Sequence, residues 1–139
     1  MGQRIDEIMT KNVVTVPING TVLEAARLMQ ENAIGDVVAV DGEQLWGLIT
    51  DRDIVTRVVA EGRPPQETSV AEVSSRNPVT VQPGQDFREA VLLMRSNDIR
   101  RLPVVDDGRL VGIVTLGDLA EHKDPNSALG DISAAPPQQ

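Results

Sequence analysis

The heptapeptide GLITDRD, residues 47–53, decides the fold, because it returns 65 positions later as GIVTLGD, residues 112–118. Outward from these two copies, residues 7–54 align with residues 72–119 without a gap. Roughly one third of the aligned pairs are identical, and self-similarity at a fixed period is the signature of a duplicated structural unit. We therefore expect two related units in this chain.

Each copy begins with a pattern typical of a strand followed by a helix. Residues 13–16 contain apolar positions around a single Thr and are followed by Pro17, which predicts a short edge strand. The pair Thr21 and Glu24 has the spacing of a capping box, in which side chain and backbone satisfy each other at a helix start. Asp86 and Glu89 repeat this signal in the second copy, and apolar residues at helical spacing follow both.

The second half of each copy predicts a hairpin and a closing helix. Strands are expected at 37–40 and 45–49, and again at 102–105 and 110–114, because apolar runs flank turn residues rich in Asp and Gly. A closing helix is expected to start at Asp51, as its N-cap, and to stop at Gly62. Its counterpart in the second copy is expected to start near Asp118 and to be short.

These elements give an α/β (α+β) fold class with two tandem β-α-β-β-α repeats. A unit of this size with one apolar sheet face is marginal alone, so we expect the repeats to pack with pseudo-two-fold symmetry into one disc. The predicted boundaries are 4–62 for repeat 1, 63–68 for a linker, 69–122 for repeat 2 and 123–139 for a mobile C-terminal tail.

Composition excludes several classes of function. The net charge is −8 and the only aromatic residues are Trp46 and Phe87, so we expect no nucleic-acid partner. The absence of Cys excludes disulfides, thiol nucleophiles and Cys-based zinc sites. No apolar run is long enough for a membrane span, and no secretory signal precedes the first charged residues, which favours a cytoplasmic protein.

Signatures of catalysis are missing from the sequence. It contains no nucleophile elbow, no zincin motif, no P-loop and no dinucleotide-binding glycine pattern. His122, the only His, is expected at a solvated helix end, and Asp51 with Asp53 is weak support for a metal site. We therefore expect neither an enzyme nor a metal centre, and no required cofactor.

The two heptapeptides resemble the closing signature of cystathionine-β-synthase (CBS) domains. In that family a Gly, two apolar residues and a Ser or Thr are followed three positions later by Asp. The opening Ile8-Met9-Thr10 and the run from Ile99 to Asp106 also resemble CBS sequences. The resemblance covers roughly residues 4–122 and implies a stand-alone CBS pair, or Bateman module, with no attached enzyme or transporter.

The residues themselves suggest a ligand. Thr50 and Thr115 end buried strands, and a helix follows each, so that backbone N–H groups and a hydroxyl could contact a phosphate. Asp53 and Asp118 can only accept hydrogen bonds when ionised, which suits the hydroxyls of a ribose. The alternative, that each Thr and Asp merely cap their helix, stays open.

The resemblance further implies composite sites that join one repeat's Thr and Asp to the other repeat. A preferred site would then comprise Thr50, Asp53, Ser75, Arg100 and Arg101, and a weaker site would comprise Thr10, Gly35, Asp36, Thr115 and Asp118. Two Arg side chains favour a phosphate in the first site. Asp36 would repel a phosphate in the second by about 1–4 kcal/mol.

Two functions remain after these steps. The first is a regulatory sensor that binds an adenosine-containing nucleotide (AMP, ADP, ATP or S-adenosylmethionine) between the repeats and signals to an unknown protein partner. The second is a nucleotide-independent homodimeric interaction protein of stress or hypoxia response with degenerate sites. A homodimer is expected in both cases, because the closing helices would leave an apolar face only partly covered, with Val55, Val58, Val59, Leu119 and Ala120.

Overall fold

The computed structural model describes residues 2–121, which form two compact units. We call residues 14–78 the central unit, and residues 2–13 together with 79–121 the terminal unit. The predicted C-terminal tail 123–139 and His122 lie outside the described residues.

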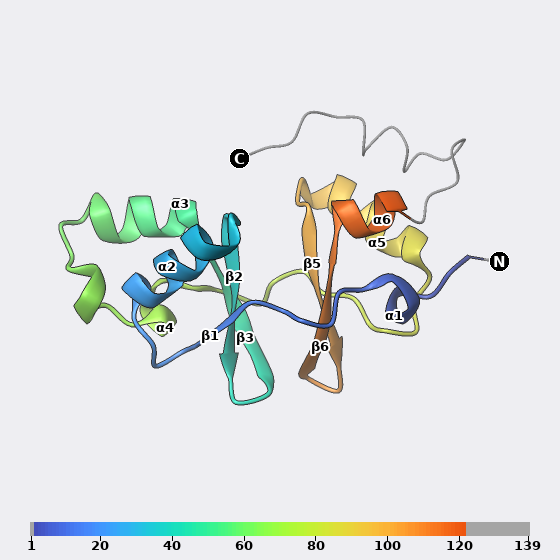
Figure 1. The fold of residues 1–139 in the computed structure, drawn as a ribbon, viewed down its shortest axis with the longest axis horizontal. Coiled ribbons are helices and arrows are strands. Elements are labelled where there is room, and N and C mark those ends of the chain that lie inside the picture. Colours follow the sequence, from blue (N-terminus) through green and yellow to red (C-terminus); the bar gives the residue numbers. More distant parts are fainter. Residues whose placement is uncertain (1, 122–139) are drawn as a thin grey trace. The chain divides into compact units, whose positions relative to one another are not determined.

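The central unit contains four strands (Figure 1). Strand β1 (Thr15–Pro17) is parallel to β2 (Asp36–Asp41), β2 is antiparallel to β3 (Gln44–Thr50), and β3 is antiparallel to the short β4 (Ser75–Arg76). The prediction of a first strand at 13–16 was wrong in its bounds. Pro17 belongs to β1, since a strand that pairs on one side only can spare the missing N–H.

Helices of the central unit are α2 (Val22–Asn32), α3 (Asp51–Ile54), the π-helix η1 (Val55–Val59), the single 3-10 turn η2 (Pro65–Glu67) and α4 (Val70–Val73). Thr21 is the N-cap of α2, as predicted, and its hydroxyl accepts the N–H of Glu24. The reciprocal bond of the predicted capping box, from the Thr21 N–H to the Glu24 side chain, does not form within the described residues. The predicted N-cap of α3 was wrong by one residue. Thr50 takes this position because its hydroxyl reaches the third helical N–H, that of Asp53.

The terminal unit is built in the same way. It contains α1 (Ile5–Ile8), α5 (Phe87–Asn97), the antiparallel strands β5 (Arg101–Asp106) and β6 (Arg109–Thr115), and α6 (Leu116–Glu121). The last helix therefore starts before the predicted Asp118, again with the preceding Thr in the capping position. An antiparallel bridge joins Thr10 to Ile113, and a parallel bridge joins Val81 to Val104.

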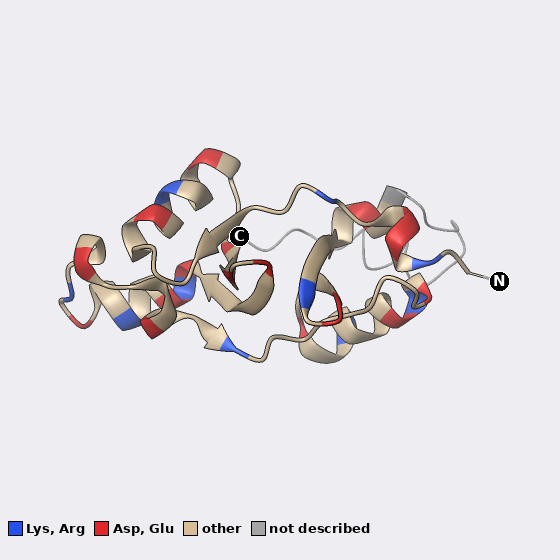
Figure 2. Cartoon of the chain, turned by 90° about the horizontal axis from the view of Figure 1, so that it is seen from below, with Lys and Arg blue, Asp and Glu red and all other residues tan. Residues whose placement is uncertain are grey.

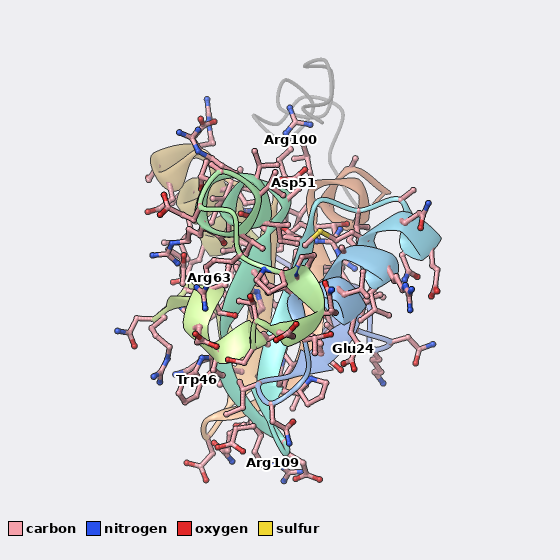
Figure 3. All side chains as sticks on the ribbon, turned by 90° about the vertical axis from the view of Figure 1, so that its left-hand side faces the viewer. Glu24, Trp46, Asp51, Arg63, Arg100 and Arg109 are labelled. Carbon is pink, nitrogen blue, oxygen red and sulfur yellow. The ribbon has the colours of Figure 1, made fainter. Side chains whose placement is uncertain are left out.

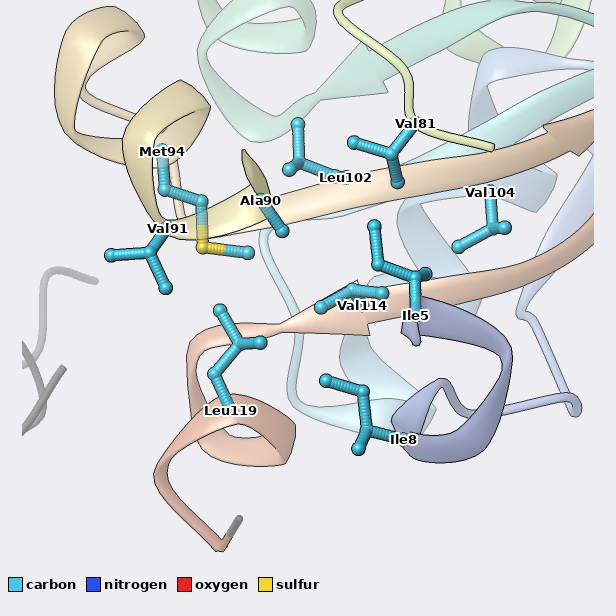
Figure 4. Packing of buried hydrophobic residues seen from close by; sticks show 10 residues of the cluster. All are labelled: Ile5, Ile8, Val81, Ala90, Val91, Met94, Leu102, Val104, Val114 and Leu119. Atoms are coloured by element: carbon cyan, nitrogen blue, oxygen red, sulfur yellow. The ribbon is translucent and has the colours of Figure 1, made fainter. Parts of the chain in front are cut away.

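Each unit has its own hydrophobic core. The core of the terminal unit, drawn in Figure 4, gathers buried side chains from α1, α5, β5, β6 and α6 together with Val81. The core of the central unit gathers equivalent positions of α2, β2, β3, η1 and α4. A chain of mixed helices and paired strands is therefore confirmed as an α+β fold.

Each unit combines the opening segment of one repeat with the strands of the other. The segment that carries Ile5 and Ile8 packs in the core with β5 and β6, and the segment that carries Val70 and Val73 packs in the core with β2 and β3. Sequence periodicity and spatial grouping thus divide the chain at different places.

Candidate functional site

Thr50 and Asp53 form a reciprocal pair where β3 ends and α3 begins. The backbone N–H of Asp53 donates to Thr50 Oγ1 at 3.0 Å, and the backbone N–H of Thr50 donates to Asp53 Oδ2 at 2.9 Å. This is a complete capping box, so Thr50 and Asp53 do cap the start of α3. A hydroxyl that accepts a hydrogen bond keeps its own hydrogen for a further acceptor, so capping leaves Thr50 able to donate to a ligand.

Thr115 and Asp118 repeat this arrangement where β6 ends. Asp118 N–H donates to Thr115 Oγ1 at 3.0 Å, and Thr115 N–H donates to Asp118 Oδ2 at 3.0 Å. Asp118 also accepts a hydrogen bond from Thr10, whose Oγ1 lies 3.1 Å from each carboxylate oxygen. The resemblance to CBS domains implied that these three residues belong together, and hydrogen bonds join them in the terminal unit.

The opening segments cross the strands at matching points in the two units. Ser75 lies opposite Leu48 and Thr10 lies opposite Ile113, so these pairs are 65 residues apart in sequence and equivalent in space. Ser75 is exposed and, within the described residues, makes no hydrogen bond to Asp53. The two Thr–Asp pairs therefore differ in the hydrogen bonds that the opening segment donates to the Asp carboxylate.

The glycine that opens each heptapeptide allows this crossing. A Cβ atom on Gly47 would overlap the carbonyl oxygen of Ser75, and a Cβ atom on Gly112 would lie 2.6 Å from Met9 Sδ and 3.1 Å from the carbonyl oxygen of Thr10. Any larger side chain at these positions would push the opening segment away from the strand. Gly thus positions Ser75 and Thr10 near the Thr–Asp pairs.

Four predicted residues lie beside the helix starts of their own units. The carbonyl of Gly35 accepts the N–H of Asp51 at 2.9 Å, and Asp36 is the strand neighbour of Thr50. In the terminal unit the carbonyl of Arg100 accepts the N–H of Leu116 at 2.9 Å, and Arg101 is the strand neighbour of Thr115. Each predicted composite site therefore takes three residues from one unit and two from the other.

A phosphate at the start of α3 would meet amides that already have partners. The N–H of Asp51 donates to Gly35, that of Arg52 donates to the Asp51 carboxylate, and that of Asp53 donates to Thr50. The backbone N–H groups that were expected to contact a phosphate here therefore already donate to acceptors of the protein. Hydroxyl and carboxylate groups of the Thr–Asp pair remain the groups best suited to a ligand.

Two contacts near Ser75 were missed by the sequence reasoning. Arg57 Nη1, in η1, donates to the carbonyl of Val73 at 2.6 Å. Arg76 places its guanidinium carbon 3.6 Å from the centre of the Trp46 ring and donates from Nε to the carbonyl of Trp46 at 3.0 Å. Figure 3 shows Trp46 toward the hairpin end of β3 and Asp51 beyond its other end. Only the pairing of a unique Trp with an Arg could have suggested the second contact.

Hydrogen bonds at the starts of α4 and α1 shift the pKa values of Glu72 and Arg4. The N–H and hydroxyl of Ser69, and then Arg63, lower the pKa of Glu72 below its usual value. Asp6 accepts hydrogen bonds from Arg4 and raises the pKa of that guanidinium.

Figure 2 shows acidic positions on helices of both units. Within residues 2–121 no helix is long and apolar enough to cross a membrane, and no group of three potential metal ligands occurs.

This duplicated fold, with a Thr–Asp pair after each hairpin, defines a known class of protein. The family model described as "CBS domain" matches residues 5–60 and again residues 70–124, and the chain belongs to this family. It contains a pair of CBS domains, which confirms the resemblance seen in the two heptapeptides.

Two relatives of similar length support this assignment. The CBS domain-containing protein YhcV of Bacillus subtilis is 44% identical over 126 residues, which cover 91% of this chain and 89% of the relative. Hypoxic response protein 1 of Mycobacterium tuberculosis is 35% identical over 117 residues, covering 84% and 82%. The names of these relatives denote no catalytic activity.

A solved structure agrees with the fold. The crystal structure of Hypoxic Response Protein I with two coordinated zinc ions matches with a TM-score of 0.79 and 33% sequence identity, covering 88% of this chain and 100% of that chain. The zinc ions are a property of that protein.

Proposed function

We propose that this CBS pair is a non-catalytic regulatory module that binds an adenosine-containing nucleotide and passes its occupancy to a partner protein. The observation that carries the proposal is the Thr50–Asp53 pair, since a hydroxyl with a hydrogen to donate lies beside a carboxylate at a half-exposed position. Within the described residues, Asp53 Oδ1 accepts no hydrogen bond. A ribose hydroxyl can donate to such an oxygen, and the Thr hydroxyl can donate to a phosphate.

The charges of nearby side chains are proposed to make the site of Asp53 bind the nucleotide more tightly than the site of Asp118. Arg100 and Arg101 are proposed to hold the phosphates of the nucleotide whose ribose contacts Asp53, because planar guanidinium groups bind phosphate with two parallel hydrogen bonds. Asp36 is proposed to weaken the site of Asp118. Binding would favour one arrangement of the CBS pair, and a partner that prefers this arrangement would respond to the nucleotide.

The test is a thermal-shift screen with AMP, ADP, ATP, NADH and S-adenosylmethionine, followed by calorimetry on each hit. A ligand at 100 times its dissociation constant adds about 2.7 kcal/mol to the stability, which shifts Tm by several degrees. Asp53→Asn is expected to remove the shift. Asp51→Asn is the matched control, because Asp51 is an exposed neighbour whose carboxylate contacts the N–H of Arg52. Equal affinity in wild type and Asp53→Asn would contradict the ribose role.

A second candidate function is a nucleotide-independent homodimeric interaction protein of stress or hypoxia response. Its support is the name of the Mycobacterium relative and the exposure of two apolar side chains one turn apart, Val55 at 57% and Val59 at 65%. A hexameric CBS-CP12 protein from cyanobacteria is similar to this chain, with a TM-score of 0.71 and 31% identity, which supports self-association.

The predicted dimer face needs one correction before it is tested. Val58 and Leu119 are fully buried within their own units, so they are unavailable to a second copy. The proposed face therefore reduces to the exposed Val55 and Val59 and the half-buried Ala120. Light scattering at micromolar concentration should show a dimer that Val59→Glu dissociates, and a monomeric wild type would contradict self-association. A dimer without any nucleotide response would favour this second function over the first.

A further inference from the structure

The two Thr–Asp pairs are equivalent in sequence and geometry, but different groups lie on their carboxylates. Asp118 accepts a hydrogen bond from Thr10, whose hydroxyl oxygen is 3.1 Å from both carboxylate oxygens. Thr10 and Asp118 are 108 positions apart in sequence, so this contact depends on the fold. At Asp53 the equivalent residue, Ser75, makes no such contact within the described part of the chain.

We propose that Thr10 is an internal competitor for the ribose at Asp118, so that the nucleotide occupies the Thr50–Asp53 pair first and the second pair opens only when Thr10 is displaced. This inference rests on the proposed nucleotide binding and adds the order in which the two pairs are used. The hydroxyl group of Thr10 sets this order. The charges of Arg100, Arg101 and Asp36 are proposed to act in the same direction.

Competition follows from hydrogen-bond chemistry. An ionised carboxylate only accepts hydrogen bonds, and a ribose offers it hydroxyl donors of the same kind as the Thr10 hydroxyl. The Thr10 hydroxyl lies 3.1 Å from both carboxylate oxygens of Asp118, so a ribose hydroxyl that approaches the pair from this side exchanges with it. Such an exchange cancels much of the gain. At Asp53 the ribose adds a donor to an oxygen that accepts none within the described residues, so the gain is retained.

The two opening segments also differ in the side chains that anchor them. In the central unit, Arg57 donates to Val73, and Arg76 stacks on Trp46 and donates to its carbonyl. These contacts hold the segment without a side-chain hydrogen bond from Ser75 to Asp53. The positions equivalent to Arg76 and Trp46 are Lys11 and Val111, which cannot form a cation–π pair. In the terminal unit the side chain of Thr10 contacts Asp118.

Calorimetry on the full chain tests this order, with AMP, ATP and S-adenosylmethionine titrated in turn. Wild type is expected to show one strong binding event and one weak event. Thr10→Val keeps the shape of the side chain and removes the donor, so it should strengthen the weak event about tenfold (about 1.4 kcal/mol) and leave the strong event unchanged. Thr56→Val is the control, because it removes another hydroxyl that hydrogen-bonds locally, to the carbonyl of Arg52.

Each outcome decides the inference. Loss of the strengthened event when Asp118→Asn is added to Thr10→Val supports it, and Thr10→Ala should act as Thr10→Val does if the latter folds poorly. Equal events in wild type overturn it, as does a second event that Thr10→Val leaves unchanged or weakens, while the proposed nucleotide binding then stands. Absence of heat with all three ligands in every variant overturns both proposals together.

Discussion

Gly47→Ala is expected to separate β4 from β3. Gly47 faces the carbonyl of Ser75 so closely that an added methyl group would overlap its oxygen, and the carbonyl carbon would lie at 3.1 Å. Both neighbours are backbone atoms, which cannot rotate away as a side chain can. Relief therefore requires β4 to move away from its partners Gly47 and Leu48.

The size of the effect follows from three contributions. Forcing extra volume into a packed site costs about 1–3 kcal/mol. Weakening the β3–β4 hydrogen bonds adds about 0.5–1.5 kcal/mol for each bond lost. Replacing Gly with Ala restricts the unfolded chain and returns about 0.4–1 kcal/mol. We therefore expect the free energy of unfolding to fall by about 2 kcal/mol, with a fall in Tm of several degrees.

Urea unfolding followed by Trp fluorescence measures this effect where it occurs, because Trp46 is the only Trp and adjoins Gly47. Gly84→Ala is the matched control. A Cβ atom at Gly84 would meet only Arg4 Nη2, at 3.7 Å, so its stability should stay within about 0.5 kcal/mol of wild type or rise slightly. If Gly47→Ala proves as stable as Gly84→Ala, the close crossing of β4 over β3 is refuted.

Four further variants test the helices. Glu72→Gln should lower stability at neutral pH, and this difference should vanish as the pH falls through the folded-state pKa of Glu72, which is lowered from 4.5, because a depressed carboxyl pKa stabilises the fold only above it. Val58→Ala should cost about 2 kcal/mol because Val58 is fully buried, whereas Val59→Ala should change stability by less than about 0.5 kcal/mol, both read from urea midpoints. Ala33→Gly should raise the free energy of unfolding by about 0.5–1 kcal/mol, because Ala33 ends α2 in the left-handed region with φ 54°. An unchanged Tm would contradict this strain.

Local patterns in the sequence predicted most elements. The hairpins around Gly42 and Gly108 and the N-caps Thr21 and Asp86 depend on residues within a few positions of one another, and the structure confirms them. The starts of α3 and α6 were misplaced because Thr and Asp both favour the N-cap, and the reciprocal bonds of Thr50 with Asp53 decide between them only in space.

The differences between the two half-sites could not be predicted from the repeat. Thr10 and Ser75 both carry hydroxyl groups, and nothing in their neighbours shows that only Thr10 contacts a carboxylate. The burial of Val58 likewise depends on α4, which comes from the second repeat in sequence. The periodic pattern of a sequence does not predict contacts between segments that are distant along the chain. Such contacts make the two copies different, although their sequences are similar.

The exchange of opening segments leads to a last prediction, which also tests the predicted domain bounds. A fragment of residues 14–78 keeps all four strands of the central unit and the buried Val70 and Val73. A fragment of residues 1–62, the first sequence repeat, loses these side chains and carries Ile5 and Ile8 without the core in which they are buried. Chains of about 60 residues fold only marginally, so the loss of two buried side chains should decide the outcome. Dispersed amide resonances and cooperative unfolding are expected for 14–78 and not for 1–62, and the reverse result would show that the sequence repeat is the folding unit.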